Sequence, residues 1–195
     1  FILNGAAADD DLGEFVTSGD INGDGLSDLI MGAKNITVNG NDDAGGVVVV
    51  YGKTSSFTSS IDVSSLTVND GFVIHGINVN DYTGDQVSSG DINGDGIDDF
   101  IISAYTDTNG VNAGSVYVLF GQTANQTSTV DLSALNGSNG FVINGINAND
   151  LTGSTVSFSN DINGDGFGDI LISADDASPN GKSDAGQSYV VFGAS

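Results

Sequence analysis

The sequence predicts an all-β protein built from three copies of one unit. Its apolar runs are short, rich in Val, Ile, Phe and Tyr, and bounded by Gly, Asn and Asp, which is typical of strands. No stretch carries the sustained 3.6-residue apolar stripe of an amphipathic helix. Three kinds of apolar run recur about every 70 residues, which indicates an internal repeat.

The repeat fills the chain and divides it into a single array of three copies, at 1–70, 71–139 and 140–195. The first kind of run is FILNG (1–5), FVIHGIN (72–78) and FVINGIN (141–147). The second is DLIMGA (28–33), DFIISA (99–104) and DILISA (169–174). The third is VVVVYG (47–52), VYVLFG (116–121) and YVVFG (189–193).

Each copy is expected to form about four antiparallel strands, joined in part by segments of the IDVSSL type. In the second copy these strands are expected near Phe72–Gly76, Gln86–Gly90, Asp99–Ala104 and Ser115–Gly121. The runs are apolar at consecutive positions, so both faces of the strands should be covered, as in small sheets stacked face to face. The aromatic residues of these runs are expected in the core: Phe72, Tyr117, Phe120 and Phe141.

The hexapeptide DINGDG occurs in every copy, at 20–25, 91–96 and 161–166, and an Asp follows three residues later. Acidic or amide side chains therefore stand at positions 1, 3, 5 and 9 of a loop in which two glycines permit a tight turn. The candidate ligands are Asp20, Asn22, Asp24 and Asp28; Asp91, Asn93, Asp95 and Asp99; and Asp161, Asn163, Asp165 and Asp169.

Hard oxygen ligands without a neighbouring imidazole or thiolate favour calcium, so we expect three calcium ions, one per copy. An EF-hand would place Glu at position 12, where this chain has Met31, Ile102 and Ile172. The competing interpretation is a plain hairpin turn, because Asn-Gly and Asp-Gly are strong turn dipeptides. A turn explains the glycines but not three mutually repelling carboxylates in all three copies, so metal binding is favoured.

These residues resemble the FG-GAP repeat of integrin α-subunit β-propellers and of many bacterial surface proteins, over the entire chain. The first half of the signature is degenerate, as GEFVTSGD (13–20), GDQVSSGD (84–91) and GSTVSFSND (153–161), and the second half is GAK, SAY and SAD. The resemblance implies β-propeller-type blades and calcium loops completed by backbone carbonyls of Leu26, Ile97 and Phe167.

The tripeptide after each hexapeptide is interpreted by the same resemblance. Its first residue needs to offer only a carbonyl, and its middle residue, Ser27, Asp98 or Gly168, is expected to be free to vary, with Asp98 solvated. The third copy has Asn160 where the others have Gly19 and Gly90, so its turn could differ.

Three blades are fewer than the roughly four to eight of known propellers, so the array is expected to be open or completed between molecules. The last copy lacks the FVxNG strand that follows the other two, and residues 1–5 form a spare strand of that kind. This strand could complete the last copy in cis or in a neighbouring chain, giving a ring or a fibre. Alternatively, the chain is a piece of a longer protein with neighbouring repeats.

Charge excludes some partners. Acidic residues outnumber basic ones by 26 to 3, the net charge is −23 and Arg is absent, so nucleic acids and anionic membranes are not expected to bind. The longest apolar run, GVVVVYG (46–52), is too short to cross a membrane. Cysteine is absent, which excludes disulfides and thiolate metal sites.

Catalysis is not expected. His75 is the single histidine, and Asn4 and Asn144 replace it in the other copies, so a surface polar role is the simpler interpretation. No G-x-S-x-G segment is present, and Asp98 and Asp99 already belong to a loop of the proposed metal type.

The favoured function is an extracellular, bacterial-type calcium-binding structural protein that self-associates into a surface assembly or fibre. The alternative is a ligand-binding adhesin module that recognises a protein or carbohydrate, and a weaker one is a fragment of a propeller-containing hydrolase. Three N-x-[ST] triplets begin at Asn35, Asn125 and Asn136, so surface glycosylation is a further expectation.

Overall fold

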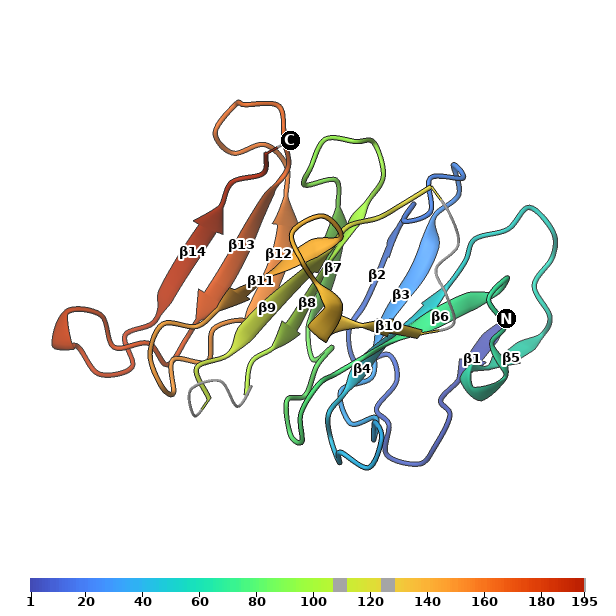
Figure 1. Cartoon of the computed structure of the whole chain (residues 1–195), viewed down its shortest axis with the longest axis horizontal. Coiled ribbons are helices and arrows are strands. Elements are labelled where there is room, and N and C mark those ends of the chain that lie inside the picture. Colours follow the sequence, from blue (N-terminus) through green and yellow to red (C-terminus); the bar gives the residue numbers. More distant parts are fainter. Residues whose placement is uncertain (107–111, 124–128, 195) are drawn as a thin grey trace.

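Three mainly antiparallel sheets follow one another along a computed structural model of the chain, which describes residues 1–106, 112–123 and 129–194. The N-terminus lies beside the first sheet, and the last sheet lies at the opposite end of the array (Figure 1). The predicted all-β fold, with three small sheets in a row, is confirmed.

The sheets share one pattern of strands. The first contains β2 (Val16–Gly19), β3 (Asp28–Gly32), β4 (Gly46–Val50), β6 (Gly71–His75) and the short β10 (Thr129–Asp131). The second contains β7 (Val87–Gly90), β8 (Asp99–Ala104), β9 (Ser115–Leu119) and β11 (Gly140–Asn144). The third contains β12 (Thr155–Ser159), β13 (Asp169–Ala174) and β14 (Gln187–Val191). The strands expected in the second copy begin and end within two residues of the observed strands β6, β7, β8 and β9.

The sheets are offset from the sequence copies. The first strand of the second copy, β6, pairs antiparallel with β4 of the first copy, and β11 pairs with β9 in the same way. The first two sheets therefore each take an outer strand from the start of the next sequence copy. This offset leaves β1 (Ile2–Asn4) outside the three large sheets.

The segments expected to be plain connections form structure of their own. One becomes β5 (Ser60–Asp62) followed by the 3₁₀ turn η1 (Val63–Ser65), and the equivalent one becomes β10 followed by η3 (Leu132–Ala134). Another 3₁₀ turn, η4 (Pro179–Gly181), lies between β13 and β14. The strands β5 and β10 run parallel to β1 and β6. Three-residue strands are too short to show an apolar period, so sequence patterns miss them.

The core fills the spaces between sheets. Ile30, Val47 and Val49 on one face of the first sheet join a buried cluster with Phe100 and Tyr117 of the second. The opposite face of the second sheet, including Ile101 and Val118, packs on Val156, Ile170 and Ile172 of the third. Alternate residues of a strand thus enter different interfaces, which explains the consecutive apolar positions.

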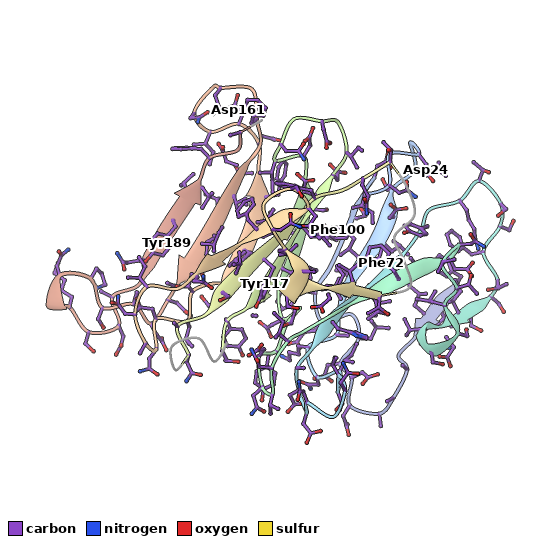
Figure 2. The ribbon with its side chains drawn as sticks, in the orientation of Figure 1. Asp24, Phe72, Phe100, Tyr117, Asp161 and Tyr189 are labelled. Carbon is purple, nitrogen blue, oxygen red and sulfur yellow. The ribbon has the colours of Figure 1, made fainter. Side chains whose placement is uncertain are left out.

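The aromatic residues named from the sequence lie in these interfaces. Phe72 and Tyr117 are buried, and Phe120 and Phe141 are partly buried and pack on each other with ring centroids 5.9 Å apart. Figure 2 shows Phe72, Phe100 and Tyr117 in the interior between the first two sheets. In the described part of the chain, no helix has the length and apolar character needed to span a membrane.

Candidate metal loops

Each DINGDG segment connects the first two strands of a sheet. The three loops lie along the same side of the array, at the same end of the strands (Figure 1). The first joins β2 to β3, the second β7 to β8 and the third β12 to β13. Figure 2 labels Asp24 and Asp161 at this end. The fold therefore repeats one acidic hairpin loop three times in a row.

The first loop is closed by its own side chains. Asp20 accepts the backbone N–H of Asp24 on Oδ1 (3.0 Å) and that of Gly25 on Oδ2 (2.8 Å). Asn22 Oδ1 also accepts the Asp24 N–H (3.0 Å), and Asp24 Oδ1 accepts the N–H of Leu26 (2.8 Å). Gly25 has φ +86°, a left-handed conformation that a glycine adopts without strain.

The other loops repeat this pattern. Asp91 Oδ2 accepts the Gly96 N–H (2.9 Å), and Asp161 Oδ2 accepts the Gly166 N–H (2.8 Å). As in the first loop, the amide oxygen at position 3 accepts the backbone N–H at position 5: Asn93 accepts from Asp95 and Asn163 from Asp165, at 2.9 Å each. Asn160 leaves these bonds intact, so the third loop keeps the turn of the other two.

The aspartate at position 9 is fully buried in every copy and joins the loop to the end of the third strand. Asp28 accepts N–H groups of Ile21 (3.1 Å) and Gly52 (2.7 Å). Asp99 accepts those of Ile92 and Gly121 at 2.9 Å each. Asp169 accepts those of Ile162 (2.6 Å) and Gly193 (3.1 Å). A turn alone does not require this buried carboxylate.

Electrostatics make two of these carboxylates costly to ionise. Burial raises the pKa of Asp28 to about 6, the two N–H donors oppose the rise, and the charges of Asp24 and Asp20 add to it. Burial raises the pKa of Asp99 to about 6 in the same way. The exposed Asp161 differs: hydrogen bonds, first from the Gly166 N–H, lower its pKa. A cation near the loop would offset the repulsion around Asp28 and Asp99.

The donor set of each loop fits a hard cation, since every candidate side chain offers a carboxylate or amide oxygen. The structure brings the side chains at positions 1, 3 and 5 into one hydrogen-bonded loop and places position 9 beneath it. In the described residues, no three acidic side chains lie close enough together to hold an ion. Their oxygens are bonded to the loop's own N–H groups.

The Asp98 carboxylate is hydrogen-bonded within the protein, although the sequence suggested that it is solvated. Its Oδ2 accepts the backbone N–H of Asp20 in the preceding loop (2.9 Å), and its own N–H donates to the Asp20 carbonyl (2.9 Å). A Cβ on Gly19 would lie 2.7 Å from Asp98 Oδ2, so the glycine at position 19 makes room for this contact. The middle residue of the tripeptide therefore connects the first two loops.

The first residue of the tripeptide also does more than offer a carbonyl. A Cβ on Gly23 would lie 3.3 Å from the Ile97 side chain, and one on Gly94 would lie 2.5 Å from the Phe167 ring. Each of these side chains therefore packs on a glycine of the preceding loop. Sequence reasoning within one loop could not find contacts that only the stacking of sheets creates.

His75 is half-buried, not a fully exposed polar residue. It lies on β6 opposite Asp131 of β10, and burial lowers its pKa while the Asp131 charge opposes that change. A cavity of about 250 Å³ has His75, Asp131 and Ser133 in its lining. Ser133 donates its hydroxyl to Asp131 Oδ1 (2.6 Å), where it supports the start of η3.

The glycosylation triplets occupy different surroundings. Asn35 donates its side-chain amide to Asp11 Oδ2 (2.8 Å). Asn136 is exposed and accepts the N–H of Ser138 (3.0 Å). Asn125 lies outside the described residues.

Comparison with known proteins agrees with this repeat. The model of the FG-GAP repeat matches residues 12–50, 83–119 and 152–191, together more than half of the chain. Integrin alpha-PS2 of Drosophila melanogaster is 28% identical over 198 residues, covering 96% of this chain and 12% of the relative. Integrin alpha pat-2 of Caenorhabditis elegans is 28% identical over 188 residues, covering 94% of this chain and 14% of the relative. Each family match spans the first three strands of one sheet with its acidic loop, and the chain belongs to the FG-GAP repeat family.

Proposed function

We propose that this chain is a calcium-binding structural module of an extracellular adhesion assembly. The observation that carries the proposal is the acidic loop itself, repeated three times with a fully buried aspartate beneath it. Two relatives are integrin alpha chains by name, which supports a role in adhesion at the cell surface. Bacterial origin remains a prediction.

In this proposal, one calcium ion is held in each loop by the side chains at positions 1, 3, 5 and 9 and the carbonyl at position 7. The carbonyls are those of Leu26, Ile97 and Phe167. When bound, calcium supplies positive charge and an oxygen-coordinating centre that ties the hairpin together. Three ions would change the net charge from −23 to about −17.

Thermal unfolding with and without a chelator tests this role. We expect the melting temperature to fall by at least about 10 °C when calcium is removed, because the loops' carboxylates then repel one another without compensation. Magnesium at the same concentration is the matched control for ionic strength. A melting temperature that does not change in chelator would overturn the calcium proposal.

We further propose that the module self-associates end to end, through the open faces of its first and last sheets. In the described part of the chain, the last sheet has no neighbouring sheet on its outer face, whereas Leu3 of β1, Ile61 of β5 and Val63 of η1 cover part of the outer face of the first. In a longer chain, neighbouring repeats would fill the same places. Sedimentation velocity of the 195-residue chain in calcium tests this proposal, which predicts oligomers and is contradicted by a monomer at all concentrations.

A ligand-binding adhesin module is the second candidate. On the side of the sheets opposite the metal loops, the connecting loops form two hollows. One of about 500 Å³ is lined by residues of 6–10, 35–37 and 42–43, and one of about 520 Å³ by residues of 147–150, 176, 178 and 184. Binding of the monomer to an extracellular protein or glycan would favour this candidate over assembly.

We propose no catalytic activity for the chain. His75 and Ser133 line the same cavity, but the Ser133 hydroxyl donates to Asp131, the residue that caps η3. Esterase and phosphodiesterase assays of the purified chain and of His75→Ala test the point. Hydrolysis by the parent chain that is lost in His75→Ala would support the hydrolase alternative.

A further inference from the structure

Asp98 stands at position 8 of the second acidic loop, between the candidate ligands Ile97 and Asp99 at positions 7 and 9. Its side chain and its backbone both bind Asp20, the candidate ligand at position 1 of the first loop. Oδ2 of Asp98 accepts the Asp20 N–H, and the Asp98 N–H donates to the Asp20 carbonyl, at 2.9 Å each. One residue therefore lies between two candidate ligands of its own loop and holds a third in the neighbouring loop.

Two further contacts hold the first loop on the second sheet. The N–H of Gln122, which follows β9, donates to the carbonyl of Ile21 (3.1 Å). The side chain of Ile97 packs on Gly23, where an added Cβ would lie 3.3 Å from it. Ile21 and Ile97 are both buried, so these contacts belong to the interior of the boundary. Positions 1, 2 and 4 of the first loop are thus all fixed by the second sheet and its loop.

The Asp98 carboxylate has a defined place in this boundary. A Cβ on Gly19, the last residue of β2, would lie 2.7 Å from Asp98 Oδ2, so the glycine leaves the space that the carboxylate occupies. The chain on the other side of Asp98 is anchored, because the fully buried Asp99 accepts the N–H groups of Ile92 and Gly121. A shift of the second loop is therefore passed to Asp20 and is not absorbed by a mobile side chain.

The boundary between the second and third loops has no such link. Gly168 stands at position 8 of the third loop and has no side chain that could accept the N–H of Asp91. In the described residues, its own N–H makes no backbone hydrogen bond to the Asp91 carbonyl. The rings of Phe158 and Phe167 pack there, against Gly168 and Gly94. Hydrogen bonds depend on direction and apolar packing does not, so the first boundary constrains a loop more tightly than the second.

We propose that Asp98 is a positioning residue that couples calcium binding in the first two loops, and that the third loop binds calcium independently of them. This inference rests on the calcium proposal above. When the Ile97 carbonyl and the Asp99 side chain hold an ion, the backbone on both sides of Asp98 is restricted. Its two bonds extend this restriction to Asp20, so the first loop loses less conformational freedom when it binds its own ion.

The coupling is reciprocal, because an effect of one bound ion on the affinity of another site must equal the reverse effect. Calcium in either of the first two loops therefore raises the affinity of the other by the same factor. The carboxylate of Asp98 also attracts a cation by its charge. Asp98→Asn separates the two effects, since an amide oxygen accepts the Asp20 N–H without carrying a charge.

The backbone N–H groups of Gly25, Gly96 and Gly166 report the three loops separately, because each donates to the aspartate at position 1 of its own loop. A calcium titration of the 195-residue chain followed by two-dimensional NMR should give one midpoint for each glycine. We expect the Gly25 midpoint to rise about tenfold in Asp95→Asn, which disables the second loop. Asp165→Asn, which disables the third loop, is the matched control and should shift the Gly25 midpoint less than about twofold.

Asp98→Ala completes a double-variant cycle with Asp95→Asn. In the Asp98→Ala background, adding Asp95→Asn should shift the Gly25 midpoint by about threefold or less, because only the backbone bond between the loops remains. Asp98→Asn keeps the acceptor and should keep the response of about tenfold. As a check on reciprocity, Asp24→Asn should raise the Gly96 midpoint by the same factor as Asp95→Asn raises that of Gly25.

A merely structural role for Asp98 predicts a different result: Asp98→Ala would lower stability but leave the response of Gly25 to Asp95→Asn unchanged, which would overturn the proposal. A response in Asp98→Asn as small as in Asp98→Ala would also overturn it, because charge would then carry the coupling. If no glycine signal responds to calcium, the calcium proposal itself fails. If all three loops bind calcium independently, the calcium proposal stands and the coupling alone is refuted.

Discussion

The carboxylate of Asp98 binds the backbone of Asp20 across the boundary between the first two sheets. Oδ2 of Asp98 accepts the Asp20 N–H at 2.9 Å, and the Asp98 N–H donates to the Asp20 carbonyl at 2.9 Å. The next boundary is built differently, because Gly168 replaces Asp98 and the Phe158 ring fills the space near it. A hydrogen bond therefore connects the first two sheets at the place where an aromatic ring packs between the second and the third.

Replacing Asp98 by alanine should therefore loosen the first boundary. The Asp20 N–H would lose a charged acceptor, at a cost of about 1–3 kcal/mol in the free energy of unfolding. Urea unfolding in excess calcium measures this change. Ser27→Ala, at the equivalent and exposed position of the first loop, is the matched control and should change stability by less than about 0.5 kcal/mol. Equal stability of the two variants would show that the Asp98 bond contributes nothing.

In chelator, the protein should become more stable as the pH falls from 7 towards 5. The folded-state pKa values of Asp28 and Asp99 are about 6, above the ordinary value of 3.8, because burial disfavours their charged forms. The folded state therefore binds protons more tightly than the unfolded state in this range. The resulting stability is present at low pH and is lost as the pH rises through about 6.

The variant Asp99→Asn isolates this effect. Its melting temperature should rise less than that of the parent chain between pH 7 and pH 5, because one of the two shifted carboxyl groups is gone. In calcium the parent chain should show the opposite trend, since protons compete with the ion for the carboxylates. Identical pH profiles of the two proteins in chelator would contradict the assignment of Asp99.

The apolar face of the last sheet gives a further prediction. Val190→Lys places a charge on the uncovered face of the last sheet, through which end-to-end association is proposed, so association should weaken at least about tenfold. Val142→Lys on β11 is the control, because Val142 has nearly the same exposure, 42% against 44%, but belongs to the second sheet, which lies between the other two. Analytical ultracentrifugation in calcium compares them. If both variants associate equally, Val190 is not in the contact.

Much of the fold was predictable because the sequence repeats its own pattern. DLIMGA, DFIISA and DILISA are each recognisable as a strand, and their recurrence sets the positions of β3, β8 and β13. The loop residues were predictable for the same reason. A carboxylate at position 9 in three copies indicates a common role, and the structure buries Asp28, Asp99 and Asp169 completely.

What the sequence could not predict depends on contacts between sheets. Asp98 and Gly168 stand at the same place in their loops, and only the neighbouring sheet decides that one accepts a hydrogen bond while the other makes room for Phe158. The parallel pairing of β5 with β1 joins residues far apart in the chain and involves only three residues on each strand. Such short segments carry no periodic signal of their own.

Calcium titration by isothermal calorimetry, with native mass spectrometry to count bound ions, tests the central claim most directly. The account predicts three ions per chain, and two in the variant Asp95→Asn, whose altered side chain belongs to the second loop alone. The absence of calcium binding, or a stoichiometry that Asp95→Asn leaves unchanged, would contradict it.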